Sequence, residues 1–370
     1  MLSPALLAAL SFFVAMPLIA SAWIGHNTDS PALRNPENLP VGAWRPVDVK
    51  AIQAGTTEDS DNQPVAPFQI GQLKYRGNLV LTSPDRRFGG FSGLRISTTD
   101  EHFLAISDRA QWLSAVPVFD AFGAITDLRQ VRMATLERYN GEILSGAAGD
   151  AEGLELTPDG GVILSFERYH RVDHYLPDRS DRFRYRQRLL HNEIVRGLES
   201  NGALESVVLL KDSRVLTLAE SPALPNAWTD QESGLVQDGA VPGWVSPPAI
   251  WYEGGDDWAP LAYQPAEGFS VTDIAQDRQT GDVYILERFF SRATGVRCRV
   301  TRLALEDIKP GTVLKGEEIA RLNMLHGIDN LEAMDLRRTE DGRLMMYLMS
   351  DDNFNIAQRT VLMSWEVTDR

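Results

Sequence analysis

The sequence predicts an all-β fold, a β-propeller in which six blades are favoured over five and the loops are decorated. Three observations predict it. After Pro67 the chain is built of short runs in which apolar and polar residues alternate, with turn residues between them. A similar two-strand unit recurs along the chain, and each unit ends a strand on an acidic residue. Repetition of this kind is typical of propellers, whereas a β-sandwich does not require the same acidic position in every unit.

The first segment, residues 1–22, is expected to be a signal peptide. It carries no charged side chain and ends in Ala20-Ser21-Ala22, a small-x-small pattern that suits signal peptidase. The alternative is an uncleaved membrane anchor, because the apolar run approaches the roughly 20 residues that span a bilayer. We therefore expect a periplasmic or secreted protein, without stable membrane insertion once the signal has been cleaved.

Two further segments follow. Residues 23–66 show little periodicity and are rich in Pro, Asn, Asp and Thr, which predicts an extended lead-in. Residues 67–370 are predicted to form one propeller domain. Between Pro222 and Pro260 the chain is rich in Trp, Gly and Pro, which indicates either a capping loop or a poorly patterned blade.

Composition narrows the class of partner. The sequence holds 36 Lys and Arg against 51 Asp and Glu, a formal net charge of −15. Nucleic acid is excluded as a partner, since phosphate contacts need clustered cations. The expected partner is a small anionic ester or ligand, and the protein is expected to be a monomer. Cys298 is the only cysteine, so neither an intramolecular disulfide nor a cysteine-based metal site can form.

The recurring unit has a characteristic head and end. Its head contains Glu-Gly or a related pair, a turn follows, and the second strand ends on an acid that often precedes Arg. Four units show this pattern, and a fifth lacks the Glu-Gly head but keeps the acidic end: residues 91–109, 151–168, 266–288 and 331–352, and the degenerate unit 207–220. Each unit resembles the two inner strands of a four-stranded blade. A sixth blade is expected within 67–90 or 235–265.

The heads and ends supply the candidate site. Acids begin three inner strands and end the strands that follow: Glu152, Glu267 and Glu332 are the heads, and Asp108, Glu167, Glu220, Glu287 and Asp351 are the ends. A tight turn places both ends of a hairpin at one edge of the sheet. We therefore expect three neighbouring pairs: Glu152 with Glu167, Glu267 with Glu287, and Glu332 with Asp351.

Like charges this close repel, and three arrangements could offset them. The arginines that follow three of the acids could pair with them, a hard cation such as Ca²⁺ could bind them, or one acid of a pair could have a raised pKa and act as a general acid or base. The predicted metal ligands are Glu152, Glu267, Glu332, Asp108 and Asp351. The predicted catalytic residues are Glu152, Glu167, Glu267, Glu287 and His170, and the predicted substrate-binding residues are Arg109, Arg168 and Arg288.

A structural role is the competing interpretation, in which the repeated acids cap backbone N–H groups and arginine is a packed counter-ion. A second candidate is the Arg- and His-rich stretch 167–193, which contains His170 and His174 and could lie over the channel and receive an anion. Ser92 lies in a sequence similar to a nucleophile elbow, but Leu94 stands where the last glycine belongs, so a blade position is favoured.

Taken together, these units resemble the phytase-like family, whose members are described by an esterase-like activity of phytase and are secreted or periplasmic bacterial proteins. The similarity covers residues 67–368 and rests on Ser92-Gly93 with Asp108-Arg109, Glu152-Gly153 with Glu167-Arg168, Glu267-Gly268 with Glu287-Arg288, and Leu331-Glu332 with Asp351-Asp352. It implies a propeller related in architecture to calcium-dependent phytases, which hydrolyse phosphomonoesters with Ca²⁺ held by acids at the channel mouth. The Asp-Ala-x-Asp-Asp-Pro-Ala segment of those enzymes is absent here, so the resemblance implies the fold more strongly than the reaction.

Two functions remain open at this point. The first is a metal-assisted hydrolase of phosphate or carboxylate esters at the channel mouth, with Ca²⁺ as the expected cofactor. The second is a non-catalytic periplasmic module for ligand binding or envelope interaction. A lactonase-like metal propeller is a weaker third. The sequence does not decide whether the protein is an enzyme.

Overall fold

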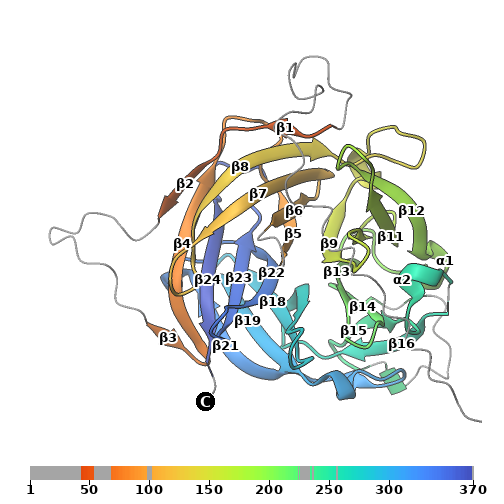
Figure 1. Cartoon of the computed structure of the whole chain (residues 1–370). Coiled ribbons are helices and arrows are strands. Elements are labelled where there is room, and N and C mark those ends of the chain that lie inside the picture. The colour runs from red at the N-terminus through yellow and green to blue at the C-terminus, as the bar shows by residue number, and fades with distance from the viewer. Residues whose placement is uncertain are drawn as a thin grey trace, which may run out of the picture.

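Five β-sheets, antiparallel except where β20 joins β16, surround a common axis in the computed structural model (Figure 1). The structure describes residues 43–53, 68–97, 102–223, 225, 234–235, 237–255 and 257–368. The expected signal peptide, residues 1–22, lies outside the described residues. In the described part of the chain, neither of the two four-residue α-helices, α1 (Asn192–Val195) and α2 (Ile250–Glu253), nor any other helix has the length and apolar character needed to cross a bilayer.

The sheets follow one another along the chain as blades. Blade 1 holds β5 (Phe91–Ile96), β6 (Phe103–Ser107), β7 (Gln111–Phe119) and β8 (Ile125–Thr135). Blade 2 holds β9 (Ala151–Leu156), β10 (Val162–Phe166), β11 (Arg171–Pro177) and β12 (Phe183–Leu190). Blade 3 holds β13 (Leu204–Leu209), β14 (Val215–Ala219), β15 (Val241–Val245), β16 (Ala259–Tyr263) and the added strand β20 (Val313–Leu314). In each of these three blades the strand given first here is the innermost.

The last two blades complete the ring. Blade 4 holds β17 (Ser270–Gln276), β18 (Val283–Ser291), β19 (Gly295–Leu303) and β21 (Glu317–Asn323). Blade 5 holds β22 (Leu331–Arg338), β23 (Leu344–Ser350), β24 (Thr360–Val367) and β4 (Leu73–Thr82). The innermost strands contact one another in the cyclic order β5, β9, β13, β17 and β22, and β22 returns to β5. The propeller therefore has five blades.

The preference for six blades was wrong, and the reason lies in the two segments expected to hide a blade. Residues 73–82 form β4, which joins the C-terminal strand β24 of blade 5 over its whole length. Residues 241–263 supply β15 and β16, the outer strands of blade 3. The stretch between Pro222 and Pro260 therefore contains part of a blade, and the degenerate unit is the inner half of that same blade.

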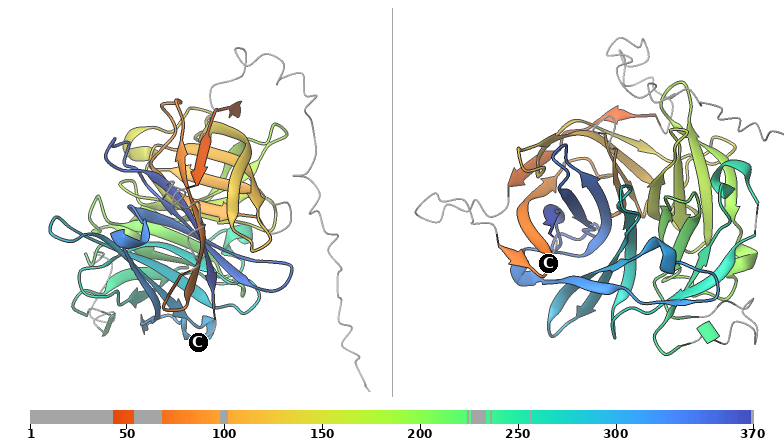
Figure 2. Two further views of the ribbon diagram at one scale, coloured as in Figure 1. Left: turned by 90° about the vertical axis from the view of Figure 1, so that its left-hand side faces the viewer. Right: turned by 60° about the horizontal axis from the view of Figure 1, so that its bottom comes forward.

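Blade 5 joins the two ends of the propeller. β4 pairs antiparallel with β24, from Leu73 opposite Val367 to Leu81 opposite Thr360. Figure 2 shows these two strands, orange and blue, side by side in both views. The segment expected to be an extended lead-in also contributes strands: β1 (Arg45–Pro46) pairs with β8, and β2 (Lys50–Gln53) pairs with β4.

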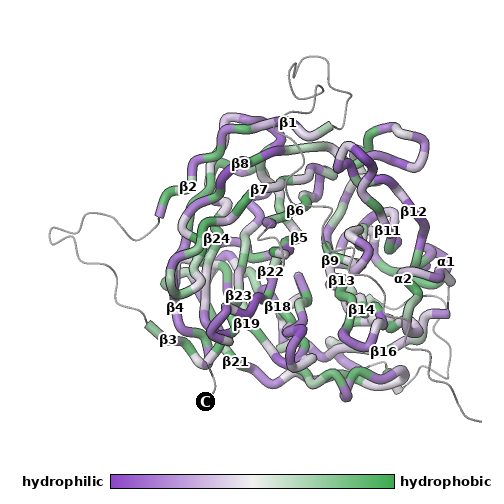
Figure 3. Tube along the Cα trace, viewed as in Figure 1, coloured by the Kyte–Doolittle hydropathy of each residue, from purple (hydrophilic) through white to green (hydrophobic). Residues whose placement is uncertain are grey.

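Apolar side chains fill the spaces between neighbouring blades. Hydrophobic and hydrophilic residues alternate along the strands (Figure 3), as expected when opposite faces of a strand meet different surroundings. The clusters between blades contain fully buried large side chains such as Trp112, Trp244 and Trp365. The innermost strands are buried almost throughout; every residue of β5 and β13 is buried. Polar side chains on these strands therefore need partners, and they indicate where the site lies.

Candidate functional site

Each innermost strand contains a bulge near its start. The pairing with the second strand shifts between residues 91 and 93 in blade 1, and at the corresponding place in the other four blades. A bulge leaves one residue out of the ladder and redirects its side chain. The residues at this position are Ser92, Glu152, Glu205, Thr272 and Glu332. Three of the five blades thus place a glutamate here, at the same end of the ring.

The second strand of each blade passes beside the bulge. On that strand, the residue that follows the pair just before the bulge is an acid in four blades and an arginine in blade 4: Asp108, Glu167, Glu220, Arg288 and Asp351. In the four acidic cases the backbone N–H of this residue donates to a carbonyl just before the innermost strand, in each case at 2.9 Å. This repeated hydrogen bond fixes the acid next to the bulge of its own blade.

The result is a group of eight carboxylic acids, which we call the acidic cluster: Asp108, Asp150, Glu152, Glu167, Glu205, Glu220, Glu332 and Asp351. Carboxylate oxygens of Asp150, Glu152 and Glu167 all lie within 4.8 Å of one another. Those of Glu167, Glu205 and Glu220 do the same. Glu167 belongs to both groups, so blades 2 and 3 share one set of ligand atoms.

Burial and mutual repulsion raise the pKa values of several of these acids. Burial, and then the charge of Asp351, raise the pKa of Asp108 to about 7. Burial is also the first cause for three others: it raises the pKa of Glu332 and of Asp351 to about 7 and that of Asp150 to about 6. The pKa values of Glu152 and Glu205 are raised well above the ordinary value by burial and by neighbouring acids.

Two arginines enter the acidic cluster. Arg288 approaches Glu220 at 3.0 Å and Glu332 at 3.2 Å, and its Nη1 donates to Asn330 Oδ1 at 3.0 Å. It therefore connects blades 3, 4 and 5. Arg168 Nε lies 2.5 Å from Asp150 Oδ2, although half of the Arg168 side chain is exposed. Arg109 lies over the ring of Phe354, 3.3 Å from its centroid, and its charge lowers the pKa of Asp108, opposing the effect of burial.

Two buried glutamates of the cluster have the fewest partners. Glu152 and Glu205 are each 9 % exposed, and among the described residues no donor forms a hydrogen bond or ion pair with either carboxylate. Asp108 Oδ1 is likewise buried without a hydrogen-bond partner among the described residues. Hydrogen bonds normally offset the cost of burying such groups. An all-oxygen set of close carboxylates with unpaired atoms fits a hard divalent cation.

Most of the acids singled out in the sequence lie in the acidic cluster. Asp108, Glu152, Glu167, Glu332 and Asp351 lie there with Arg168 and Arg288. Their roles as catalytic, binding and metal-ligating residues remain predictions. The arginines, however, do not pair with the acid that precedes each of them: Arg168 pairs with Asp150, and Arg288 pairs with acids of the two neighbouring blades.

Glu267 and Glu287 do not join the cluster, contrary to expectation. Glu267 is exposed in the turn before β17, and Thr272 takes the bulge position in blade 4. In β18 Glu287 is the residue paired just before the bulge, opposite Val271, and Arg288 takes the next position, where the other blades have the acid. Because side chains alternate between the faces of a strand, this offset of one residue directs Glu287 to the other side.

Glu287 has a separate, fully satisfied environment. Its carboxylate accepts from the hydroxyl of Tyr263, from Arg299 Nη1 at 2.7 Å and from the backbone N–H of Ala266 at 3.1 Å. Tyr263 and Arg299 come from the outer strands of blades 3 and 4. This arrangement matches the structural role that was the competing interpretation for the repeated acids.

Two members of the acidic cluster, Glu205 and Asp150, are not predicted by the comparison of the repeated units. Glu205 is followed by Ser206 and not by glycine, so its unit lacks the Glu-Gly pair that marks a head. Asp150 lies one residue before β9 and outside the repeated pattern. A signal for Glu205 was nevertheless present, since Leu204-Glu205 precedes a strand pair that ends on Glu220, at the spacing of Ala151-Glu152 from Glu167.

The Arg- and His-rich stretch 167–193 forms strands β11 and β12 of blade 2 and does not lie over the axis. Its arginines largely pair with acids: Arg171 and Arg188 with Asp173, and Arg182 and Arg184 with Glu137 and Asp178. His174 is buried on β11, with Nε2 3.6 Å from Asp159 Oδ1. His170 is 6 % exposed in the turn after β10, and burial lowers its pKa.

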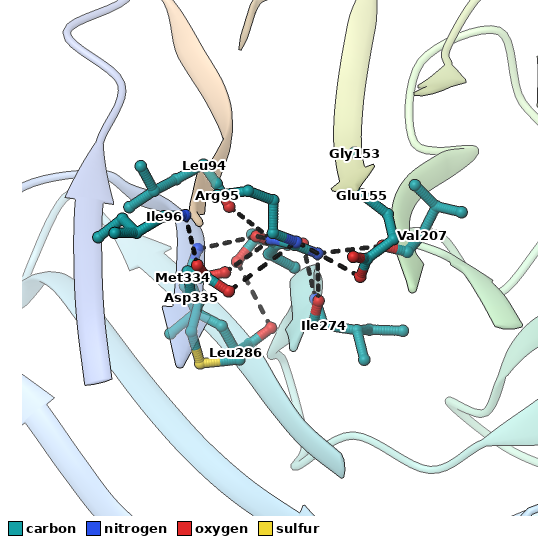
Figure 4. Close-up of polar contacts among 12 residues, drawn as sticks. Leu94, Arg95, Ile96, Gly153, Glu155, Val207, Ile274, Leu286, Met334 and Asp335 are labelled. Carbon is teal, nitrogen blue, oxygen red and sulfur yellow. Dashed lines mark hydrogen bonds and ion pairs between the residues drawn. The ribbon is translucent and has the colours of Figure 1, made fainter. Parts of the chain in front are cut away.

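A single arginine fills the axis beyond the acidic cluster. Arg95 lies three residues after the bulge of β5, about 10 Å farther along the strand. Its guanidinium donates to the carbonyls of Met334 at 2.9 Å, Val207 at 3.2 Å and Ile274 at 2.8 Å (Figure 4). Its Nε lies 3.5 Å from Glu155, and Nη1 lies 3.4 Å from Asp273. Arg95 thus contacts the innermost strands of all four other blades.

Comparison with known proteins places this site in a family. The model of the phytase-like family, described as esterase-like activity of phytase, matches residues 86–354. The chain belongs to the phytase-like family. The matched residues include every member of the acidic cluster and both arginines that enter it. No curated protein sequence matches the chain.

The solved structures to which this chain is similar are distant in sequence. A protein described as a gluconolactonase is 11% identical, with 90% of this chain and 96% of the other covered and a TM-score of 0.40. A glucose dehydrogenase is 11% identical, covers 74% and 96%, and has a TM-score of 0.37. A protein of Thermus thermophilus described as an oxidoreductase (glucose dehydrogenase) is 11% identical, covers 75% and 97%, and has a TM-score of 0.42.

Proposed function

We propose that this protein is an exported hydrolase of phosphate or carboxylate esters that acts at the acidic end of the propeller axis with the assistance of Ca²⁺. The observation that carries the proposal is the acidic cluster itself, in which acids from four blades converge and Glu152 and Glu205 have no donor among the described residues. The family description, an esterase-like activity, supports ester chemistry. The charge-free segment 1–22 supports export to the periplasm or the medium.

The residues that would hold the cation are the two groups that share Glu167: Asp150, Glu152, Glu167, Glu205 and Glu220. When bound, Ca²⁺ would polarise the ester oxygen and neutralise the charge that the acids leave uncompensated. Arg168 is the cation best placed to receive the anionic part of the substrate, because half of its side chain is exposed beside Asp150.

The chemistry proposed for the chain's own residues is proton transfer. A water molecule attacks the phosphorus or the acyl carbon, a new bond to its oxygen forms, and the bond to the leaving oxygen breaks. The attacking water gives its proton to an ionised carboxylate of the cluster, and a protonated carboxyl group gives a proton to the leaving oxygen. Asp108 and Asp351, each with a pKa raised to about 7, can serve in either form near neutral pH.

Hydrolysis of 4-nitrophenyl phosphate and 4-nitrophenyl acetate, with Ca²⁺ and with EDTA, tests the proposal. We expect turnover of at least one of them with Ca²⁺ and a loss of at least tenfold with EDTA, together with a rise in melting temperature when Ca²⁺ is added. Absence of turnover, with no thermal shift by Ca²⁺, would rule out the hydrolase. Saturable binding of these compounds without turnover would instead support a non-catalytic ligand-binding module.

A further inference from the structure

A cavity of about 490 Å³ lies beside the acidic cluster on blade 2. Strands β11 and β12 contribute Asp173, Tyr175, Tyr185 and Arg188 to it. The segment between β8 and β9 contributes Arg138, Tyr139, Leu144 and Ala148, and the turn after β10 contributes Tyr169 and His170. The cavity is thus lined by side chains of blade 2 and of the connection from blade 1.

Two of the segments that line the cavity lead directly into the acidic cluster. Ala148 is two residues before Asp150, and Tyr169 is two residues after Glu167, so each cavity residue has its Cα within about 7 Å of the Cα of a cluster acid. Arg171 Nη2 donates to the carbonyl of Ala148 at 2.6 Å, and Nη1 donates to that of Tyr169 at 2.8 Å. This arginine therefore fastens both segments together between the cavity and the cluster.

The charge of the cavity is opposite to that of the cluster. Three arginines line it, Arg138, Arg171 and Arg188, against one acid, Asp173. Asp173 is 2 % exposed and already pairs with Arg171 at 2.8 Å and Arg188 at 2.9 Å. Arg138 is exposed, and its side chain has no ion pair with any residue that the structure describes. With histidine neutral, the lining carries a net charge of about +2, in a protein whose net charge is −15.

Tyrosine rings supply the remaining surface. Tyr139 and Tyr169 are 81% and 62% exposed, and Tyr185 lies between Tyr139 and the buried Tyr175 with edge-to-face contacts to both. His170 lines the same cavity, is buried, and its Nδ1 has no hydrogen-bond partner among the described residues. Flat aromatic walls favour a flat ligand, because rings pack through offset-stacked and edge-to-face contacts. A free guanidinium favours a carboxylate or phosphate on that ligand.

We propose that this cavity holds the leaving group of the ester substrate, and that it selects an aromatic leaving group bearing a second negative charge. The inference rests on the proposed hydrolase function and deepens it, since it assigns the substrate class. The ester bond then lies at the acidic cluster, and the ring points outward along blade 2. Arg138 receives the second charge, and Tyr139 packs against the ring.

Two matched substrates test the selection. In 4-carboxyphenyl phosphate and 4-carbamoylphenyl phosphate the leaving groups have nearly the same shape, but only the first bears the second charge. We expect kcat/KM to favour the carboxylate by about tenfold, the effect of one charge-assisted hydrogen bond. Arg138→Gln should abolish this preference. Arg186→Gln is the matched control, since Arg186 is exposed on β12, a strand that contributes to the cavity, but does not itself line the cavity. Equal preference in the wild type, or equal effects of both variants, overturns the inference.

A binding measurement separates this inference from the hydrolase proposal. Calorimetric titration with 4-hydroxybenzoate in EDTA is expected to show binding that Arg138→Gln and Tyr139→Ala each weaken about tenfold. The controls Arg186→Gln and Tyr252→Ala should leave this binding unchanged, since Tyr252 is exposed on α2 and does not line the cavity. Such binding without any ester turnover would contradict the hydrolase proposal and would support the cavity as a binding site for aromatic anions. Ester turnover without 4-hydroxybenzoate binding would contradict the role proposed for the cavity and would still support the hydrolase proposal.

Discussion

Glu152 and Glu205 have an unusual position among the acids of this protein. Both are buried at bulges of innermost strands, both face other carboxylates, and neither has a donor among the described residues. A buried carboxylate in this situation lowers the stability of the folded state whenever it is ionised. A cation that bound here would therefore supply stability as well as chemistry.

Replacement of either glutamate by glutamine tests this directly. In EDTA at pH 8, Glu152→Gln and Glu205→Gln should each raise the melting temperature by roughly 2–4 °C, because a buried charge among like charges is removed. Each should also reduce the stabilisation by Ca²⁺, measured by differential scanning fluorimetry. Glu267→Gln is the control, since Glu267 is exposed outside the cluster. A lower melting temperature in EDTA for both variants would contradict the account.

Arg288 should behave in the opposite way. It is the guanidinium that approaches both Glu220 and Glu332, and its Nη1 donates to Asn330. Arg288→Met should destabilise the protein by about 1–3 kcal/mol, because two partly buried carboxylates lose their partner. Arg288→Lys should recover part of that loss. Urea unfolding of the three proteins at pH 8 measures it, and a methionine variant as stable as the wild type would show that the pairs contribute nothing.

At the scale of the strand, Arg95 connects elements that share few other polar contacts. Innermost strands of different blades are not hydrogen-bonded to one another as a sheet. The Arg95 guanidinium donates to carbonyls of three of them and lies beside carboxylates of Glu155 on β9, Asp273 on β17 and Asp335 on β22. One side chain from β5 thus fixes the spacing of the ring around the axis.

Loss of this side chain should be costly. Arg95→Met leaves the buried carboxylates of Asp273, Asp335 and Glu155 without it, and should destabilise the protein by about 3–5 kcal/mol in urea unfolding. Arg278→Met is the matched control. Arg278 also pairs with Glu155, at 2.6 Å, but 45% of its side chain is exposed, so its loss should cost less than about 1 kcal/mol. Similar losses for the two variants would mean that the position on the axis has no special importance.

The strand scale also shows what could be predicted from the sequence. The repeated head, turn and acidic end predict the inner hairpins. They also predict that Glu152, Glu167, Glu332 and Asp351 lie at one end of the ring. Glu287 does not join them, because an offset of one residue reverses the face of a strand and the sequence of β18 does not reveal where the bulge falls. The sequence does not predict the role of Arg95. Its partners are mostly backbone carbonyls of distant blades, and such partners leave no pattern in the sequence.

At the scale of the whole molecule, the clustered acids make stability depend on pH. Asp108, Glu332 and Asp351 have folded-state pKa values raised to about 7, and Asp150 to about 6, against about 4 in an unfolded chain. A raised pKa contributes stability that is complete below the unfolded value and is lost as pH rises through the folded value. The metal-free protein should therefore lose stability as the pH rises from about 4 to about 7.

Urea unfolding in EDTA at pH 5 and pH 8 measures this loss. We expect a lower free energy of unfolding at pH 8, and a stabilisation by Ca²⁺ that is larger at pH 8 than at pH 5. The double variant Glu152→Gln, Glu205→Gln should show a shallower decline than the wild type, which separates the cluster from the general repulsion of a chain with net charge −15. Equal stability at the two pH values would show that these acids do not couple to folding.

The blade count also belongs to this scale, because it depended on which strands complete which sheet. The alternating patterns in 67–90 and 235–265 correctly indicate strands. The prediction of six blades is wrong because it gives one of these segments a blade of its own. A strand that completes a distant blade has the same local sequence as one that begins a new blade, since only its partner differs.

Blade 5 combines strands from both ends of the propeller, and this affects the order in which the molecule folds. Blades 1 to 4 are built mainly from consecutive segments, so their hairpins can form as the chain leaves the ribosome. β4 is synthesised before all of them, yet its partner β24 lies at the other end of the propeller. The ring therefore stays open until synthesis is nearly complete, and its last step joins the most distant segments of the domain. A chain that is transported before that step would finish folding only on arrival.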